Sequence, residues 1–128
     1  MKIGNIKFKA KRLDNGEWVE GDLKHSTSYV GIGYPSSAFP DVPIVHRVDP
    51  SSVCMFTGLK DCKGNEIWEG DIVHDSYDRL CIDNLYEVVY IEEEGTFAFK
   101  SLDKVDNYEP FVNLFEVYVV GNKFDKEK

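Results

Sequence analysis

The stretch Ile6–Leu23, IKFKAKRLDNGEWVEGDL, predicts two antiparallel strands joined by a turn. Apolar residues at positions 6, 8 and 10 alternate with lysines, which is the pattern of a strand with one buried face. Asn15-Gly16 favours the positive φ angles of a tight turn, and Trp18-Val19 begins the returning strand. We therefore expect the chain to open with a β-hairpin.

Beyond this hairpin, short apolar runs alternate with turn residues as far as the C-terminus. The expected strands are IVHRVDP, SVCMFTGL, GDIVHDSYDRLCI, LYEVVYIE and LFEVYVVGNKF, with turns at Gly64 and Gly95. Residues 25–43 are rich in Pro, Ser and Gly and predict a short strand around Tyr29–Ile32 followed by a loop. Residues 103–113 predict a loop or one short helical turn. Apolar residues nowhere recur with a helical period over three turns, so the sequence predicts an all-β protein.

Length and composition indicate a folded protein without a membrane anchor. The chain has 128 residues, of which 42% are apolar and 30% charged, which suits one domain or two small lobes. No apolar run is long enough to span a bilayer, and no secretory signal pattern follows the basic N-terminus. Cys54, Cys62 and Cys81 are odd in number and form no CxxC pair. We expect a cytoplasmic protein of a bacterial cell with three free thiols.

Negative charge is concentrated in residues 66–116. This segment has 14 acidic and 3 basic residues, whereas residues 1–65 have 7 acidic and 9 basic residues. An acidic segment of this kind would repel nucleic acid, so we expect no direct nucleic-acid binding, and it would attract a basic protein. The plainer interpretation is a solvated acidic surface. The lysines at positions 7, 9 and 11 are expected on an edge strand, where they would prevent aggregation.

One short motif occurs twice, as EWVEGDL from Glu17 and as EIWEGDI from Glu66. A glycine in such a motif permits either a positive φ angle or a close approach that a Cβ would block. The aspartate would accept backbone hydrogen bonds and fix the turn. The motif therefore predicts a turn or bulge that begins a strand, formed by Glu20, Gly21, Asp22 and by Glu69, Gly70, Asp71.

The alternative makes these carboxylates a metal or acid–base site. Such a site needs further ligands that converge on it. The three histidines lie in separate segments and form no HxH or HExxH pattern: His25, His46 and His74. No P-loop, zinc or nucleophile motif is present either. We therefore expect no catalytic, cofactor-binding or metal-binding residues, and no cofactor.

The two copies also predict where the tryptophans lie. Aligned on Glu-Gly-Asp, Trp18 falls opposite Ile67, and Trp68 falls opposite Val19. Because side chains alternate along a strand, the two tryptophans should point to opposite faces. We expect Trp18 in the core and Trp68 on the outer face, partly exposed.

The segment Val48–Val73, VDPSSVCMFTGLKDCKGNEIWEGDIV, resembles the motif of the YopX-like family of small phage and prophage proteins. KFKAKRLDNGEWVEGDL near the N-terminus and EVYVVGNKFD near the C-terminus are similar to further segments of that family, in the same order. Cys54 and Cys62 depart from the residues common in the family. The resemblance implies an all-β fold with an SH3-like β-barrel in the C-terminal half, and it implies no established activity.

On this basis we expect an N-terminal β-hairpin region with its Pro/Ser/Gly-rich loop at residues 1–48 and an SH3-like barrel at residues 49–128. The expected function is that of a phage-encoded, non-enzymatic interaction module or self-assembling module, with a homo-oligomer or a host or phage protein as partner. Two alternatives stay open: an acidic decoy for a host nucleic-acid-binding protein, and a metal-dependent enzyme using the Glu-Gly-Asp carboxylates. The candidate interaction surface comprises Tyr29, Tyr34, Phe39, Trp68, Glu92, Glu93 and Glu94.

Overall fold

The computed structural model describes residues 2–75, 85–102, 108–110 and 117–125 of the chain. Its regular structure is β-strand apart from two short 3-10 helices, η1 (Ile3–Asn5) and η2 (Pro50–Ser52). The prediction of an all-β protein is confirmed. Neither helix formed by the described residues is long or apolar enough to cross a membrane. The chain divides into two compact units, Met1–Phe56 and Thr57–Lys128.

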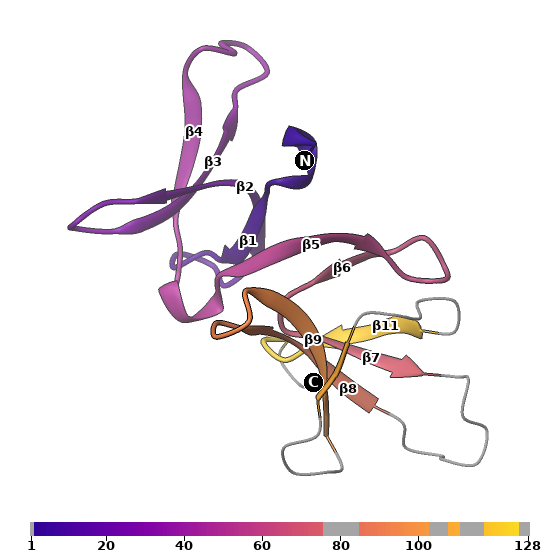
Figure 1. Ribbon diagram of the computed structural model, residues 1–128. Coiled ribbons are helices and arrows are strands. Elements are labelled where there is room, and N and C mark those ends of the chain that lie inside the picture. The colour runs from indigo at the N-terminus through magenta and orange to yellow at the C-terminus, as the bar shows by residue number, and fades with distance from the viewer. Residues whose placement is uncertain (1, 76–84, 103–107, 111–116, 126–128) are drawn as a thin grey trace. The chain divides into compact units, whose positions relative to one another are not determined.

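The first unit is an antiparallel sheet in the order β4-β3-β2-β1-β5 (Figure 1). Its strands are β1 (Phe8–Lys11), β2 (Trp18–His25), β3 (Val30–Pro35), β4 (Pro43–Arg47) and the first residues of β5 (Cys54–Lys60). Proline stands at the last position of β3 and the first of β4, where its missing N–H costs no ladder bond within a strand. The short strand predicted around Tyr29–Ile32 is present as β3.

The predicted β1–β2 hairpin is confirmed, with a longer turn than a two-residue one. Lys11 pairs with Trp18, and the Arg12 N–H donates to the Glu17 carbonyl at 2.8 Å. Gly16 has the positive φ angle, 72°, that the sequence requires at this turn. Its N–H donates to the Arg12 carbonyl at 2.9 Å, which closes the turn.

The apolar face of this sheet forms the core of the first unit. Ala10, Ile32 and Val48 are buried there, and Val19 packs against them. β1 lies between β2 and β5, so the prediction that its lysines lie on an edge strand is wrong. Instead, the ammonium groups of Lys9 and Lys11 each lie 4.7 Å from the centre of the Trp18 ring, an attractive cation–π arrangement.

The second unit contains the β5–β6 pair and a five-stranded antiparallel sheet in the order β10-β9-β8-β7-β11. Its strands after β5 are β6 (Glu66–Trp68), β7 (Asp71–Asp75), β8 (Leu85–Ile91), β9 (Thr96–Ser101), β10 (Tyr108–Pro110) and β11 (Val117–Asn122). The described strands of this sheet do not close into a barrel, so the SH3-like barrel stays a prediction. The loop or helical turn predicted over residues 103–113 is wrong at 108–110, which pair with β9 as a strand.

The core of the second unit is separate from that of the first. Ile67, Val73, Val88 and Val117 are at most 3% exposed, and the ring of Phe99 packs with them. These residues come from β6, β7, β8, β9 and β11, so the apolar side chains that alternate with polar ones along these strands meet in one core.

The boundary between the two units falls after Phe56, whereas the sequence suggested residue 48. Residues 49–56 pair with the first unit because β5 begins beside β1: Met55 lies opposite Phe8, and Cys54 lies opposite Lys9. The Ser52 hydroxyl also accepts the Lys11 N–H at 2.8 Å. Backbone pairing of this kind joins segments far apart in sequence, so composition alone does not locate the boundary.

Candidate interaction surface

The hairpin formed by β8 and β9 brings three consecutive glutamates to one exposed turn. Tyr90 pairs with Phe97 and Ile91 pairs with Thr96. The turn spans residues 92–95 and is closed by the Gly95 N–H, which donates to the Ile91 carbonyl at 2.8 Å. Gly95 has a φ angle of 64°, a conformation that other residues rarely adopt. The turn therefore presents Glu92, Glu93 and Glu94 to solvent.

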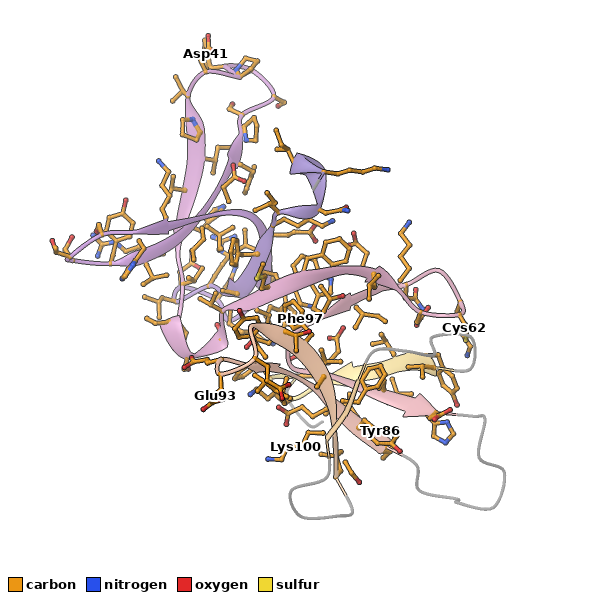
Figure 2. All side chains as sticks on the ribbon, in the orientation of Figure 1. Asp41, Cys62, Tyr86, Glu93, Phe97 and Lys100 are labelled. Atoms are coloured by element: carbon orange, nitrogen blue, oxygen red, sulfur yellow. The ribbon has the colours of Figure 1, made fainter. Side chains whose placement is uncertain are left out.

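A hollow of about 490 Å³ lies beside this turn. It is lined by Val89, Tyr90, Ile91, Glu92, Glu93, Glu94 and Lys100. Figure 2 shows Glu93 at the turn and Lys100 farther along β9. Three carboxylates against one ammonium group give the hollow a balance of two negative charges. We name this hollow the acidic hairpin surface.

An aromatic pair supports the acidic hairpin surface. Tyr90 is 43% exposed, and its ring meets the Phe97 ring edge-on, with 5.2 Å between ring centres. Phe97 in turn packs against the buried core of the second unit. An exposed aromatic ring beside carboxylates can hold a lysine or arginine side chain by ion pairing and by contact with the ring. The glutamates were predicted from the sequence, whereas Tyr90 was not, although it stands only two positions before Glu92.

The aromatic residues predicted to be exposed differ from one another in the structure. Phe39 is 70% exposed. Tyr34 is half-buried, and its hydroxyl lies 3.0 Å from Nε2 of His46. Tyr29 is half-buried beneath the guanidinium group of Arg47, which lies 5.0 Å from the ring centre. Of these three aromatic residues, only Phe39 offers a large exposed ring.

The second Glu-Gly-Asp copy forms the predicted turn. Gly70 has a φ angle of 84°, and the Asp71 carboxylate accepts the Trp68 N–H at 2.7 Å. The other oxygen of Asp71 accepts the side-chain amide of Asn122 at 3.0 Å. Asp71 is 3% exposed. This aspartate therefore holds the turn and joins it to β11.

The first copy of the motif is not a turn. Gly21 lies within β2, opposite Phe8, and Asp22 pairs with Gly33. A Cβ at Gly21 would clash with the Gly33 carbonyl oxygen. The prediction of a turn at residues 20–22 is therefore wrong. Gly21 is required there because two strand backbones approach closely.

The predicted places of the two tryptophans are also wrong. Trp68 is 5% exposed and thus buried together with its neighbour Ile67. Trp18 is half-exposed beside two lysines, while Val19 packs against the core. Ile67 and Trp68 are adjacent and both buried, so strand alternation fails at Trp68, the last residue of β6 before the Gly70 turn. Trp68 therefore does not belong to an exposed interaction surface.

Asp61 is a buried aspartate that was not predicted from the sequence to have a structural role. Its carboxylate accepts the backbone N–H groups of Lys63, Asn65 and Val119 at 2.8–2.9 Å. Burial opposes ionisation of Asp61, but these hydrogen bonds outweigh burial, so its pKa lies below its ordinary value. The turn after Asp61, with Gly64 at a φ of 85°, could have indicated part of this arrangement. The contact with Val119 could not have been read from the sequence.

The described residues contain no group of three His, Cys, Asp or Glu side chains that could hold a metal ion. The two copies of the motif lie in different units, and both Asp71 oxygens accept hydrogen bonds. Cys54 is buried and Cys62 is exposed. Cys81 lies outside the described residues. The expectation of a chain without a metal site stays a prediction.

The fold thus defines a two-unit all-β protein whose second unit contains the acidic hairpin surface. The chain belongs to the YopX family, described as YopX protein, whose pattern it matches over residues 7–127. The resemblance drawn from the sequence is therefore confirmed. A crystal structure of protein EF1440 from Enterococcus faecalis is similar, with a TM-score of 0.53 and 23% sequence identity over 91% of this chain and 92% of that chain. At this identity the similarity shows a shared fold. Comparison with curated proteins finds no match.

Proposed function

We propose that this YopX-family chain is a non-enzymatic protein-interaction module, encoded by a phage or prophage and acting in the cytoplasm of the host cell. The observation that carries the proposal is the acidic hairpin surface, a hollow lined by exposed Tyr90 and by three glutamates. Its partner is a basic protein that inserts a lysine or arginine side chain between Tyr90 and the carboxylates.

Charge favours this partner in two ways. The excess negative charge of residues 66–116 attracts a basic protein at a distance and raises its rate of association. At the surface itself, each exposed ion pair contributes about 0.2–1 kcal/mol, and contact with the Tyr90 ring contributes about 0.5–1 kcal/mol. Several such contacts together give a weak to moderate, salt-dependent affinity.

The charge distribution also favours a second, narrower candidate. A protein that normally binds nucleic acid has a basic surface, and an acidic protein can occupy that surface as a decoy. The three glutamates of the turn would then take the place of phosphate groups. This candidate shares the acidic hairpin surface with the first and differs from it in predicting competition with nucleic acid.

The proposal that the chain is not an enzyme rests on the Glu-Gly-Asp carboxylates. A metal-dependent or acid–base reaction needs carboxylates with oxygen atoms available to a substrate or an ion. Asp71 is 3% exposed, and its oxygens hold Trp68 and Asn122. Its position supports a structural role.

The test is binding of a fluorescent peptide rich in lysine and arginine, measured by anisotropy over a range of salt concentrations. Replacing the three glutamates of the turn with glutamine should weaken binding at low salt and reduce its salt dependence. Tyr90→Ala should weaken binding about 2–5-fold, as expected for loss of one cation–π contact. A duplex DNA competitor then separates the two candidates. When the bound partner is a nucleic-acid-binding protein, DNA should displace the chain only if the chain acts as a decoy.

The matched control removes the same number of charges elsewhere. It consists of the exposed substitutions Glu17→Gln, Asp22→Asn and Asp41→Asn. If this control weakens peptide binding as much as the substitutions in the turn do, the effect comes from net charge, and the proposed surface is wrong. Unfolding midpoints measured on every variant show that the fold is retained.

A further inference from the structure

Strand β4 has a partner on only one side along most of its length. Within the described residues it pairs with β3 and forms the end of its sheet (Figure 1). Several apolar side chains on and beside this strand are exposed: Leu13 and Val42 by 63% and Ile44 by 39%. An exposed edge with apolar side chains is a template for pairing with another strand.

The hydrogen bonds at the end of β4 show which residues face the open side. The Val48 N–H donates toward β3, to the Val30 carbonyl, at 3.0 Å. The Arg47 carbonyl accepts the Leu13 N–H at 3.0 Å on the opposite side. Because backbone groups alternate along a strand, the N–H and carbonyl of Val45 and the carbonyl of Pro43 point to the open side.

The open part of the edge is short and has a definite end. Arg12 pairs with Val48, so Leu13 already occupies the place opposite Arg47. A hollow of about 360 Å³ begins there, lined by Leu13, Asp14, Val45, His46 and Arg47. A strand from another molecule therefore finds open backbone only from Val45 to Pro43.

We propose that Pro43–Val45 pairs in the antiparallel direction with the same segment of a second copy of this chain, about a two-fold axis at Ile44. In this register each Val45 N–H donates to the Pro43 carbonyl of the other copy. The missing N–H of proline is not required for these two bonds. A register centred on Val45 would instead place a residue of the second copy where Leu13 lies.

Charge complementarity supports the same register. Asp41, in the turn before β4, and Arg47, at the end of β4, are each three positions from Ile44, so this register brings Asp41 of each copy toward the Arg47 end of the other copy's strand. Both residues are exposed, and Figure 2 shows Asp41 at the tip of the β3–β4 hairpin. The exposed side chain of Ile44 meets its counterpart at the two-fold axis, and Val42 comes opposite His46 of the other copy. The contact is isologous and closes as a dimer.

This self-association is independent of the proposed binding of a basic protein, which uses the acidic hairpin surface of the other unit. The contact is small, so we expect a reversible dimer that forms with rising protein concentration. Binding of an extended segment of another protein to the same edge is the competing outcome.

Disulfide trapping tests the register directly. Residues of a non-hydrogen-bonded antiparallel pair have Cα atoms about 4.5 Å apart, within the range of a disulfide. Ile44→Cys should therefore give a 44–44 cross-linked dimer under mild oxidation, in a Cys62→Ser background with the bond assigned by peptide mapping. Val42→Cys is the matched control, since its two copies would lie about 14 Å apart, too far for a disulfide.

Charge exchange tests the partner. In the Ile44→Cys background, Asp41→Lys alone and Arg47→Asp alone should each lower the cross-link yield several-fold, because like charges then meet. A mixture of the two variants should restore the yield as heterodimer. The proposal is overturned if Val42→Cys cross-links as readily as Ile44→Cys, if Ile44→Cys gives no dimer, or if mixing gives no recovery. Sedimentation of the unmodified chain at rising concentration should show a monomer–dimer equilibrium, and a strict monomer would also contradict it.

Discussion

Replacing Asp61 with asparagine should strongly destabilise the second unit, although the two side chains have nearly the same shape. One carboxylate oxygen accepts the Lys63 and Asn65 N–H groups, and the other accepts the Val119 N–H and the Asn65 side-chain amide. An asparagine keeps one oxygen and replaces the other with an NH₂ group, which cannot accept. Either orientation therefore leaves at least one backbone N–H facing a donor.

The magnitude follows from those bonds. A hydrogen bond to a charged group contributes about 1.5–3 kcal/mol, and a buried unsatisfied N–H costs about 1–3 kcal/mol. Since Asp61 is 6% exposed, water does not replace the lost acceptor. We expect Asp61→Asn to lower the free energy of unfolding by about 3 kcal/mol, a large share of the 5–15 kcal/mol typical of a domain.

The same carboxylate makes stability depend on pH. Because the folded pKa of Asp61 lies below its unfolded value, ionisation of Asp61 favours the folded state fully above the ordinary pKa of 3.8. That contribution is lost as the pH falls through the folded pKa. Asp61→Asn lacks it at every pH, so the difference in stability between the native protein and the variant should shrink in acid.

Urea unfolding followed by tryptophan fluorescence at pH 7 and at a series of acidic pH values measures both effects. Asp41→Asn is the control, because Asp41 is exposed and its substitution should change stability by no more than about 0.5 kcal/mol. The reasoning is refuted if Asp61→Asn costs no more than this control at neutral pH. It is also refuted if the difference between native protein and variant does not decrease in acid.

Three further outcomes are expected. Gly70→Ala should lower the free energy of unfolding by about 1 kcal/mol or more, because Gly70 has a positive φ angle. Gly21→Ala should lower it by at least as much, because the added Cβ clashes with the Gly33 carbonyl. In the same urea assay Gly4→Ala should cause no change, because its Cβ meets no atom within 4 Å. Cys62 should react with a thiol reagent in the folded protein, whereas Cys54 should react only after unfolding, and equal rates would contradict the burial of Cys54. A chelator should leave the unfolding midpoint unchanged, and a fall in the midpoint that is reversed by a divalent ion would reveal a metal site.

Much of the fold could be predicted because local patterns coincide with the structure. The alternation of lysines and apolar residues gave the β1–β2 hairpin, and the glycines at positions 64 and 95 gave turns with positive φ angles. The family resemblance, carried by motifs in all parts of the chain, is confirmed over residues 7–127. The glutamates of the acidic hairpin surface were also identified, as one consecutive run of charge.

The same seven-letter pattern nevertheless forms a strand at Gly21 and a turn at Gly70, and this difference was decided by tertiary structure. Local sequence determined which backbone conformations were available, since glycine allows both a positive φ angle and a close backbone approach. Which of the two occurs depends on partners distant in sequence: the Gly33 carbonyl beside Gly21, and Asn122, 51 residues away, holding Asp71 after Gly70. Burial of Trp68 and the bond from Val119 to Asp61 were decided in the same way, because burial and long-range hydrogen bonds exist only once separate strands have packed together.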